Sequence, residues 1–140
     1  MLRAAHGRLE ITTPGQSLVE ITDEIKQWTR RQAMEEGLLT LYCRHTSASL
    51  LIGENAAPAV RADLEAFFAR LVLEDRALYS HNDEGPDDMP SHIRTALLGV
   101  STSIPLLGGE LALGVWQGVF LFEHRRAPHR REILLTLIGA

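Results

Sequence analysis

The sequence contains a single cysteine, Cys43, so the chain cannot form a disulfide within itself. Cys43 lies in an apolar, strand-like run, and burial in such surroundings raises the pKa of a thiol. We therefore expect a buried and inert cysteine rather than a nucleophile. Aromatic residues are also scarce, at 6% of the chain, which predicts a core built from aliphatic side chains.

Long apolar runs and an excess of positive charge are absent as well. No apolar run approaches the roughly 18 residues of a membrane-spanning helix, and the N-terminus lacks the charged-then-apolar pattern of a signal peptide. We expect a cytoplasmic protein that makes no contact with a membrane. The net charge of -4 argues against general nucleic-acid binding, which depends on clustered positive charge.

The sequence does contain enough apolar residues, 45% of 140, for one globular domain spanning residues 1–140. Short alternating or apolar runs predict strands at 8–13, 38–44, 49–52, 101–107, 110–114, 119–123 and 131–137. Apolar residues spaced by three and four predict helices at about 18–35, from Pro58 to Leu71, and from Ser91 to a stop at Gly99. Since strands outnumber helices and most connections are short, we predict an α+β fold in which two to three helices pack on one face of a mainly antiparallel sheet.

The segment 81–92 concentrates ligand-type side chains, with two histidines and four carboxylates in twelve residues. Gly85, Pro86 and Pro90 exclude a continuous helix or central strand, so we interpret the segment as a shaped loop that leads into the helix near Ser91. A loop of this composition is either a solvated acidic turn with incidental histidines or a functional site.

His45 follows a predicted strand in the run His-Thr-Ser-Ala-Ser, where hydroxyls and turn amides can orient an imidazole or bind an anion. On its own, a histidine at a strand end is more often structural. If the loop directs His81 and His92 into one pocket with His45, the three imidazoles define a catalytic metal site with an open fourth position. The loop carboxylates would then ligate the ion, orient the imidazoles or hold magnesium through waters, and Asp83 is the one we expect nearest the metal or substrate.

Basic residues gather in the segment 123–131, which has four arginines and two histidines in nine residues. A basic cluster is usually a solvated surface, but planar guanidinium groups also suit bidentate contacts to phosphate. Farther upstream, glycines flank Trp116 and Gln117, and glycines in a strand often mark a bulge or the close approach of a ligand. Trp116 therefore either fills the core or contacts such a ligand.

These motifs resemble the secondary thiamine-phosphate synthase family, the YjbQ-type proteins, over nearly the whole chain. The most specific part is a serine, spaced aliphatic residues and a glycine followed by Gly-x-Trp-Gln, carried here by Ser101, Ile104, Leu106, Gly109, Gly114, Trp116, Gln117 and Val119. The runs at 45–50, 54–55, 84–93 and 123–125 match in the same order. The chain departs from the family where an aspartate, an asparagine and a threonine are frequent, at Ala57, Gly53 and Val115 respectively.

The resemblance implies a compact α+β subunit in a homotrimer, and a transferase activity that joins a pyrimidine pyrophosphate to a thiazole phosphate to give thiamine phosphate and pyrophosphate. It also implies a divalent metal ion, zinc or magnesium, held by His45, His81 and His92. The residues implied to contact the phosphorylated substrate are Asn55, Trp116, Gln117, His124, Arg125, Arg130 and Arg131. Two other functions stay open: metal-dependent hydrolysis, and non-catalytic binding of a metal or phosphorylated metabolite by a trimer.

Overall fold

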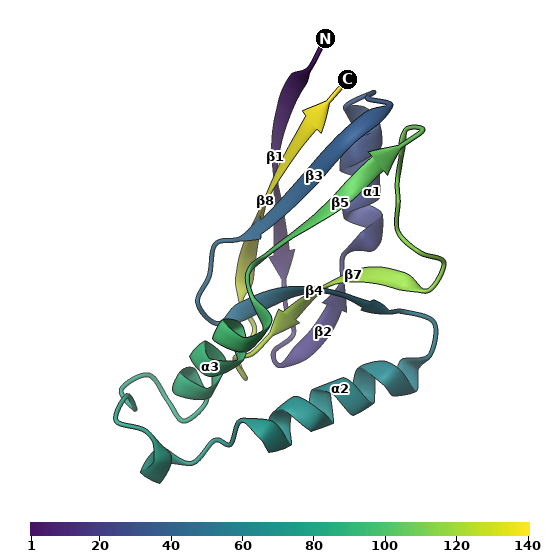
Figure 1. Cartoon of the computed structure of the whole chain (residues 1–140). Coiled ribbons are helices and arrows are strands. Elements are labelled where there is room, and N and C mark those ends of the chain that lie inside the picture. Colours follow the sequence, from purple (N-terminus) through teal and green to yellow (C-terminus); the bar gives the residue numbers. More distant parts are fainter.

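All 140 residues are described by a computed structural model, in which two antiparallel β-sheets and three α-helices form one α+β unit (Figure 1). The predicted fold class is thereby confirmed. In chain order the elements are β1 (Arg3–Thr12), β2 (Ser17–Glu20), α1 (Thr22–Arg31), β3 (Glu36–Cys43), β4 (Ala48–Glu54), α2 (Pro58–Leu71), the short 3-10 turn η1 (Arg76–Leu78), α3 (Asp88–Leu98), β5 (Ser101–Leu107), β6 (Glu110–Leu111), β7 (Gln117–Glu123) and β8 (Arg130–Gly139).

The strands divide between two sheets rather than forming the one sheet that the sequence predicts. The larger sheet has the order β1-β8-β3-β5-β6, and the smaller has the order β2-β7-β4. Alternate residues of β8, namely Ile133, Leu135 and Leu137, are buried in the main core between the sheets. Helix α1 adds Ile25 and Trp28 to this core. The period of two along β8 therefore gives the larger sheet one buried and one solvent-facing side.

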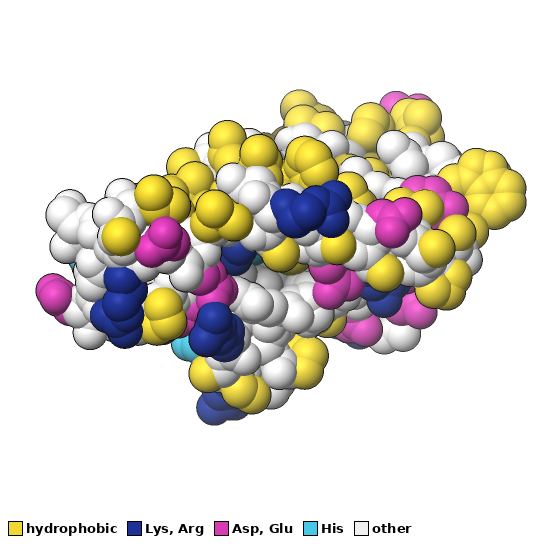
Figure 2. Space-filling view, turned by 90° about the horizontal axis from the view of Figure 1, so that it is seen from below, with side chains coloured by type: hydrophobic (Ala, Val, Ile, Leu, Met, Phe, Trp, Pro, Cys, Tyr) yellow, Lys and Arg dark blue, Asp and Glu magenta, His cyan; other side chains and the backbone are white.

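A second, smaller core lies on the other side of the smaller sheet. Leu18, Phe120 and Phe122 are buried there, and α2 packs Leu64 and Phe68 against them. Figure 1 shows α2 running beneath β2, β4 and β7, while α3 lies at one end of the smaller sheet. Seen from below, the face that carries α2 exposes many hydrophobic side chains (Figure 2). Helix α2 has no fully buried residue, so it covers the smaller sheet as an outer layer.

The prediction of a helix over residues 18–35 is wrong at both ends. Residues Ser17–Glu20 form β2, which pairs with β7, and the helix runs only from Thr22 to Arg31. Leu18 packs in the second core and Val19 packs in the main core, on opposite faces of the smaller sheet. Neighbouring side chains point to opposite faces only in an extended strand, so the two cores select β-structure here.

Helix α3 begins at Asp88, three residues earlier than predicted, although it ends before Gly99 as expected. Pro90 is tolerated because it lies in the first turn, where the backbone N–H needs no helical acceptor. Ser91 is therefore not the capping residue: its hydroxyl donates to the carbonyls of Asp87 and His124. None of the three helices has the length and apolar character needed to span a membrane.

Candidate metal centre

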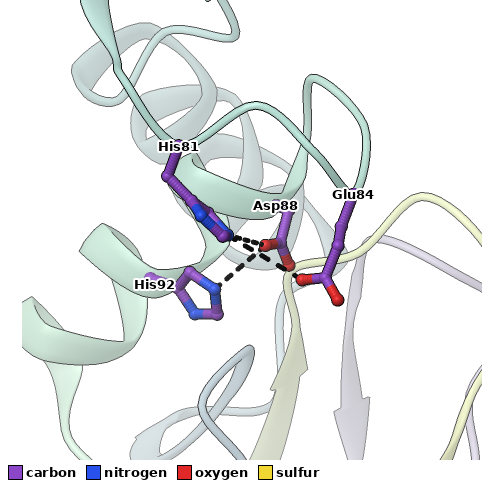
Figure 3. Close-up of side chains that lie close together, drawn as sticks. All are labelled: His81, Glu84, Asp88 and His92. Atoms are coloured by element: carbon purple, nitrogen blue, oxygen red, sulfur yellow. Dashed lines mark hydrogen bonds and ion pairs between the residues drawn. The ribbon is translucent and has the colours of Figure 1, made fainter.

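Four side chains that could hold a metal ion converge at the start of α3 (Figure 3). His81 and Glu84 come from the loop after η1, and Asp88 and His92 lie one turn apart on α3. One potential ligand atom from each lies within 4.8 Å of all the others. The pairing within α3 follows from its early start, because residues four apart share one face of a helix.

Asp88 is the centre of this group. Its side chain is only 2% exposed, and its Oδ2 lies 2.8 Å from Nε2 of His81 and 3.1 Å from Nε2 of His92. The other carboxylate oxygen accepts a hydrogen bond of 3.0 Å from Arg125. Burial opposes ionisation, but the hydrogen bond with His81 and the charge of Arg125 hold the pKa of Asp88 below its ordinary value. Asp88 is therefore a carboxylate at neutral pH.

The hydrogen bonds of His92 determine which of its nitrogens carries a proton. Nδ1 lies 2.9 Å from the carbonyl oxygen of Thr46, which can only accept, so Nδ1 is the donor. In a neutral imidazole Nε2 then holds a lone pair, and this lone pair faces the carboxylate of Asp88. Two acceptors at 3.1 Å repel each other unless a cation, either a proton or a metal ion, lies with them.

The donor set fits a first-row divalent ion. Two imidazole nitrogens with one or two carboxylates are typical ligands of zinc and its neighbours, whereas magnesium prefers oxygen ligands throughout. The bond from His92 to Thr46 is the outer contact that commonly orients a metal-binding imidazole. Glu84 is exposed, and its Oε2 lies 3.8 Å from Nε2 of His81, so it is the ligand with most freedom to move.

His45 is not brought into this group, so the expectation that one chain surrounds an ion with His45, His81 and His92 is not met. At the end of β3 its Nε2 accepts a hydrogen bond of 2.8 Å from the backbone N–H of Glu132. Burial, together with the charge of Arg131, lowers the pKa of His45. The pairing of β3 with β8 thus fixes His45 as a neutral imidazole with its proton on Nδ1.

His45 and His92 nevertheless share an open depression of about 720 Å³. Thr95 also lines it, and the buried Oγ1 of this threonine has no hydrogen-bond partner. The depression therefore places His45 beside His92, as the sequence predicts, and adds Thr95, which the sequence does not indicate. Thr95 carries no sequence signal for such a role, because a threonine inside a helix is ordinary.

Asp83 does not occupy the position predicted for it. It is exposed and its side chain forms no hydrogen bond, whereas Asp88 contacts both loop histidines. The i, i+4 spacing of Asp88 and His92 is the signal that could have identified Asp88, but it applies only if the helix includes both residues. A helix that starts at Ser91, as predicted, excludes Asp88, so the spacing of Asp88 and His92 then has no helical meaning.

The arginines of the segment 123–131 are engaged within the chain. Arg125 donates hydrogen bonds to Asp87, at 2.9 Å, and to Asp88, at 3.0 Å. The hydrogen bond with Asp87 and the charges of both carboxylates raise the pKa of Arg125. Arg131 is 4% exposed and pairs with the buried carboxylate of Glu123. Arg130 lies on the surface and pairs with Glu10 at 3.0 Å. The predicted phosphate contacts of Arg125 and Arg131 would thus compete with carboxylates already bound.

The other predicted substrate contacts are not gathered at the cluster. Asn55 bonds to Glu20, and Gln117 accepts from the backbone of Gly114. Trp116 is 65% exposed, so the interpretation of this residue as core is wrong. In the β4–β7 register Glu54 is opposite Gln117, whereas Ala48 is opposite Glu123. Six residues along a strand cover about 20 Å, so Asn55 and Gln117 lie at the far end of the smaller sheet from His124.

The sequence of this chain is similar to those of several known proteins. The family model described as UPF0047 protein YjbQ-like matches residues 7–140. A UPF0047 protein of Synechocystis is 50% identical over 94% of this chain and 89% of its own length. The UPF0047 protein YjbQ of Salmonella typhimurium is 50% identical over 85% of this chain and 86% of its own.

Solved structures share the fold. A conserved hypothetical protein of Thermus thermophilus is 33% identical and superposes with a TM-score of 0.80, covering 92% of this chain and 97% of its own. A YbjQ-like protein of unknown function from Sulfolobus solfataricus has a TM-score of 0.91 with 100% coverage of both chains at 21% identity, a likeness of fold alone. These names state no substrate and no metal.

Proposed function

This chain belongs to the UPF0047 YjbQ-like protein family, and we propose that its cluster of His81, Glu84, Asp88 and His92 is the metal centre of an enzyme acting on phosphorylated small molecules. The observation that carries the proposal is that Nδ1 of His92 is held as a donor, so that Nε2 of His92 and the carboxylate of Asp88 converge with His81 and Glu84 on a position for one cation. The specific reaction is the one implied by the resemblance in sequence: a pyrimidine pyrophosphate and a thiazole phosphate give thiamine phosphate and pyrophosphate.

A divalent ion bound at the cluster would supply a Lewis acid that neutralises charge on phosphoryl oxygens. The chain's own residues have three tasks there. His81, His92 and Asp88 hold and orient the site. Arg125 bonds to the outer oxygen of Asp88, which keeps that carboxylate ionised and its inner oxygen directed at the imidazoles.

The depression beside His92 is the proposed substrate site. Its volume of about 720 Å³ lies within the range of pockets that take small metabolites. His45 offers an Nδ1 proton and Thr95 a hydroxyl, and both suit the oxygen atoms of a phosphate ester. In this arrangement catalysis consists mainly of positioning and electrostatic stabilisation of the leaving pyrophosphate.

The outer face of the larger sheet supports the homotrimer that the resemblance implies. Leu38 on β3 is opposite Ile138 on β8, and both are about half exposed, at 47% and 52%. Tyr42 continues this face at 48% exposure. Adjacent apolar side chains on a flat sheet are a common feature of subunit interfaces. We propose that subunits associate through this face.

The test is an assay of purified, metal-replete protein with both precursors, in which thiamine phosphate is the expected product. His92→Ala and Asp88→Ala should reduce the rate by at least about 100-fold, because both remove contacts to the ion. His129→Ala is the matched control, since the only hydrogen bond of this partly exposed imidazole is with the carbonyl of Ala127 in its own turn. Release of phosphate without joining would indicate a hydrolase instead, and binding without turnover would indicate a binding protein.

A further inference from the structure

A second cavity, of about 150 Å³, lies between α2, α3 and β7, and none of its lining residues belongs to the metal cluster. Its polar lining includes Arg94 of α3 and His124 after β7, and its apolar lining includes Phe68 and Phe122. Both polar residues are more than nine-tenths buried, at 5% and 1% exposure. Each of them has a nitrogen without a hydrogen-bond partner, Nε of Arg94 and Nδ1 of His124.

Arg94 is a buried cation that lacks an ion pair. One of its terminal nitrogens donates a hydrogen bond of 2.8 Å to the carbonyl oxygen of Val72. This is the only hydrogen bond of the Arg94 side chain. A guanidinium group removed from water is costly unless an anion or several acceptors surround it. Burial lowers the pKa of Arg94, in keeping with this shortage of partners. The unpaired Nε–H lies in a residue that lines the cavity and is a donor for an acceptor placed there.

His124, which also lines the cavity, is a second buried residue with an unpaired nitrogen. Its Nε2 lies 2.8 Å from Oγ of Ser49, a fully buried hydroxyl with no other partner. If Nε2 carried the proton, the hydroxyl hydrogen of Ser49 would have no acceptor. The tautomer that satisfies both groups therefore has Ser49 donating to Nε2 and the imidazole proton on Nδ1. Nδ1–H is then an unsatisfied donor beside the cavity.

The charges around the cavity select the kind of anion. Arg94 is the only unpaired cation of the lining, while Glu65 and Glu123 also border the cavity. Glu123 is already neutralised by Arg131. Because Glu65 adds a negative charge that no ion pair neutralises, a phosphate dianion would meet more repulsion than an anion with a single negative charge held by Arg94. The two phenylalanine rings suit a hydrocarbon group attached to that charge.

We propose that this cavity binds a small monocarboxylate, whose oxygens accept hydrogen bonds from Nε of Arg94 and Nδ1 of His124 while its hydrocarbon part packs against Phe68 and Phe122. The site stands apart from the metal centre and does not depend on the function proposed for it. Charge-assisted bonds from buried donors are the strong ones, so the ligand would also remove the cost of leaving both donors unpaired.

The experiment is a titration of nitrogen-15-labelled protein with acetate, propionate and inorganic phosphate at constant ionic strength, following Nε of Arg94 and Nδ1 of His124 by NMR. Propionate should shift both signals saturably and at lower concentration than acetate, and phosphate should not. Absence of saturable shifts with the carboxylates, which would leave water as the only occupant, overturns the proposal. Saturation by phosphate alone overturns it equally.

Arg94→Met removes the buried cation and should abolish propionate binding, and a second variant that fills the cavity keeps the test decisive where Arg94→Met does not fold. Ala69 is an exposed residue of α2 that also lines the cavity, so Ala69→Leu should occupy the space without disturbing the core. We expect propionate binding to weaken by at least about tenfold, the loss of about one charge-assisted hydrogen bond. Ala62→Leu, at an exposed position of the same helix that does not line the cavity, should bind as the wild type does. Equal affinities for the two variants would contradict the site.

Discussion

The hydrogen-bond partners of His92 and His45 determine which ring nitrogen of each imidazole carries the proton. The carbonyl of Thr46 places the proton of His92 on Nδ1, and the backbone N–H of Glu132 places that of His45 on Nδ1 as well. The first arrangement directs a lone pair toward Asp88, and the second directs a donor toward the neighbouring depression. The same residue type thus serves two different tasks, because the backbone partners differ.

His124 should make the folded protein sensitive to moderate acid. Burial, with the charge of Arg94, lowers its pKa from 6.5 to about 3, so between these values the unfolded chain holds more protons than the folded one. Stability should therefore fall as the pH falls from 6.5, with a slope approaching about 1.4 kcal/mol per pH unit from this residue. His45 acts in the same direction, and below 4.5 Glu123 adds to the loss.

Urea unfolding at a series of pH values between 6.5 and 4.5 measures this slope, and His124→Gln should flatten it. A glutamine cannot be protonated in this range, so the contribution of His124 should disappear while that of His45 remains. If the variant and the wild type lost stability at the same rate with falling pH, His124 would not be the buried neutral imidazole described above.

At the scale of elements, a close approach between β1 and α1 holds the edge of the larger sheet to the core. A Cβ atom at Gly7 would lie 2.1 Å from Nε1 of Trp28, so only glycine leaves room for the indole ring. Gly7→Ala should therefore lower the free energy of unfolding by about 1–3 kcal/mol, the usual cost of overpacking.

A double-mutant cycle with Trp28→Leu isolates this contact. The smaller side chain leaves space for the added methyl group, so Gly7→Ala should cost less in the Trp28→Leu background than alone. Chemical denaturation of the four proteins gives the coupling energy. Strictly additive effects would show that the alanine is harmful for a reason other than the ring.

The element boundaries show what the sequence can and cannot predict. The helix at Pro58 and most strands follow from apolar periodicity or from short apolar runs bounded by turn residues. The same periodicity predicts a helix rather than a strand over residues 17–20, because a linear pattern cannot show that Leu18 and Val19 pack in separate cores. The sequence predicts the start of α3 three residues too late, because Pro90 indicates a helix boundary. A proline is, however, also compatible with the first turn of a helix.

The same limits apply to the site. His81 and His92 could be predicted to meet because they flank one short loop, and the structure brings their rings together. The pairing of Arg125 with Asp87 and Asp88 joins residues almost forty positions apart, and no local pattern reports such a contact. The density of ligand-type side chains in the segment 81–92 therefore predicts where the site lies. The hydrogen-bond partners of each side chain can be found only from the folded structure.

At the scale of the whole molecule, one face of the larger sheet has no covering layer in the single chain. We expect the wild type to sediment as a trimer and Leu38→Glu to sediment as a smaller species, because a charge on this face would be buried by association. Phe67→Glu on α2 is a matched control, since Phe67 and Leu38 are both 47% exposed. Sedimentation velocity compares the three proteins, and a trimeric Leu38→Glu would exclude this face as the interface.

The zinc content of the purified protein, after metal removal and reconstitution, shows whether the cluster around Asp88 binds a divalent metal ion. We predict about one zinc per chain for the wild type and for His129→Ala, from a site with two imidazoles and at least one carboxylate. Asp88→Asn and His92→Gln should retain less than about a tenth of that, with circular dichroism showing that both remain folded. Equal zinc content in the wild type and in these two variants would show that the cluster around Asp88 is not a zinc site.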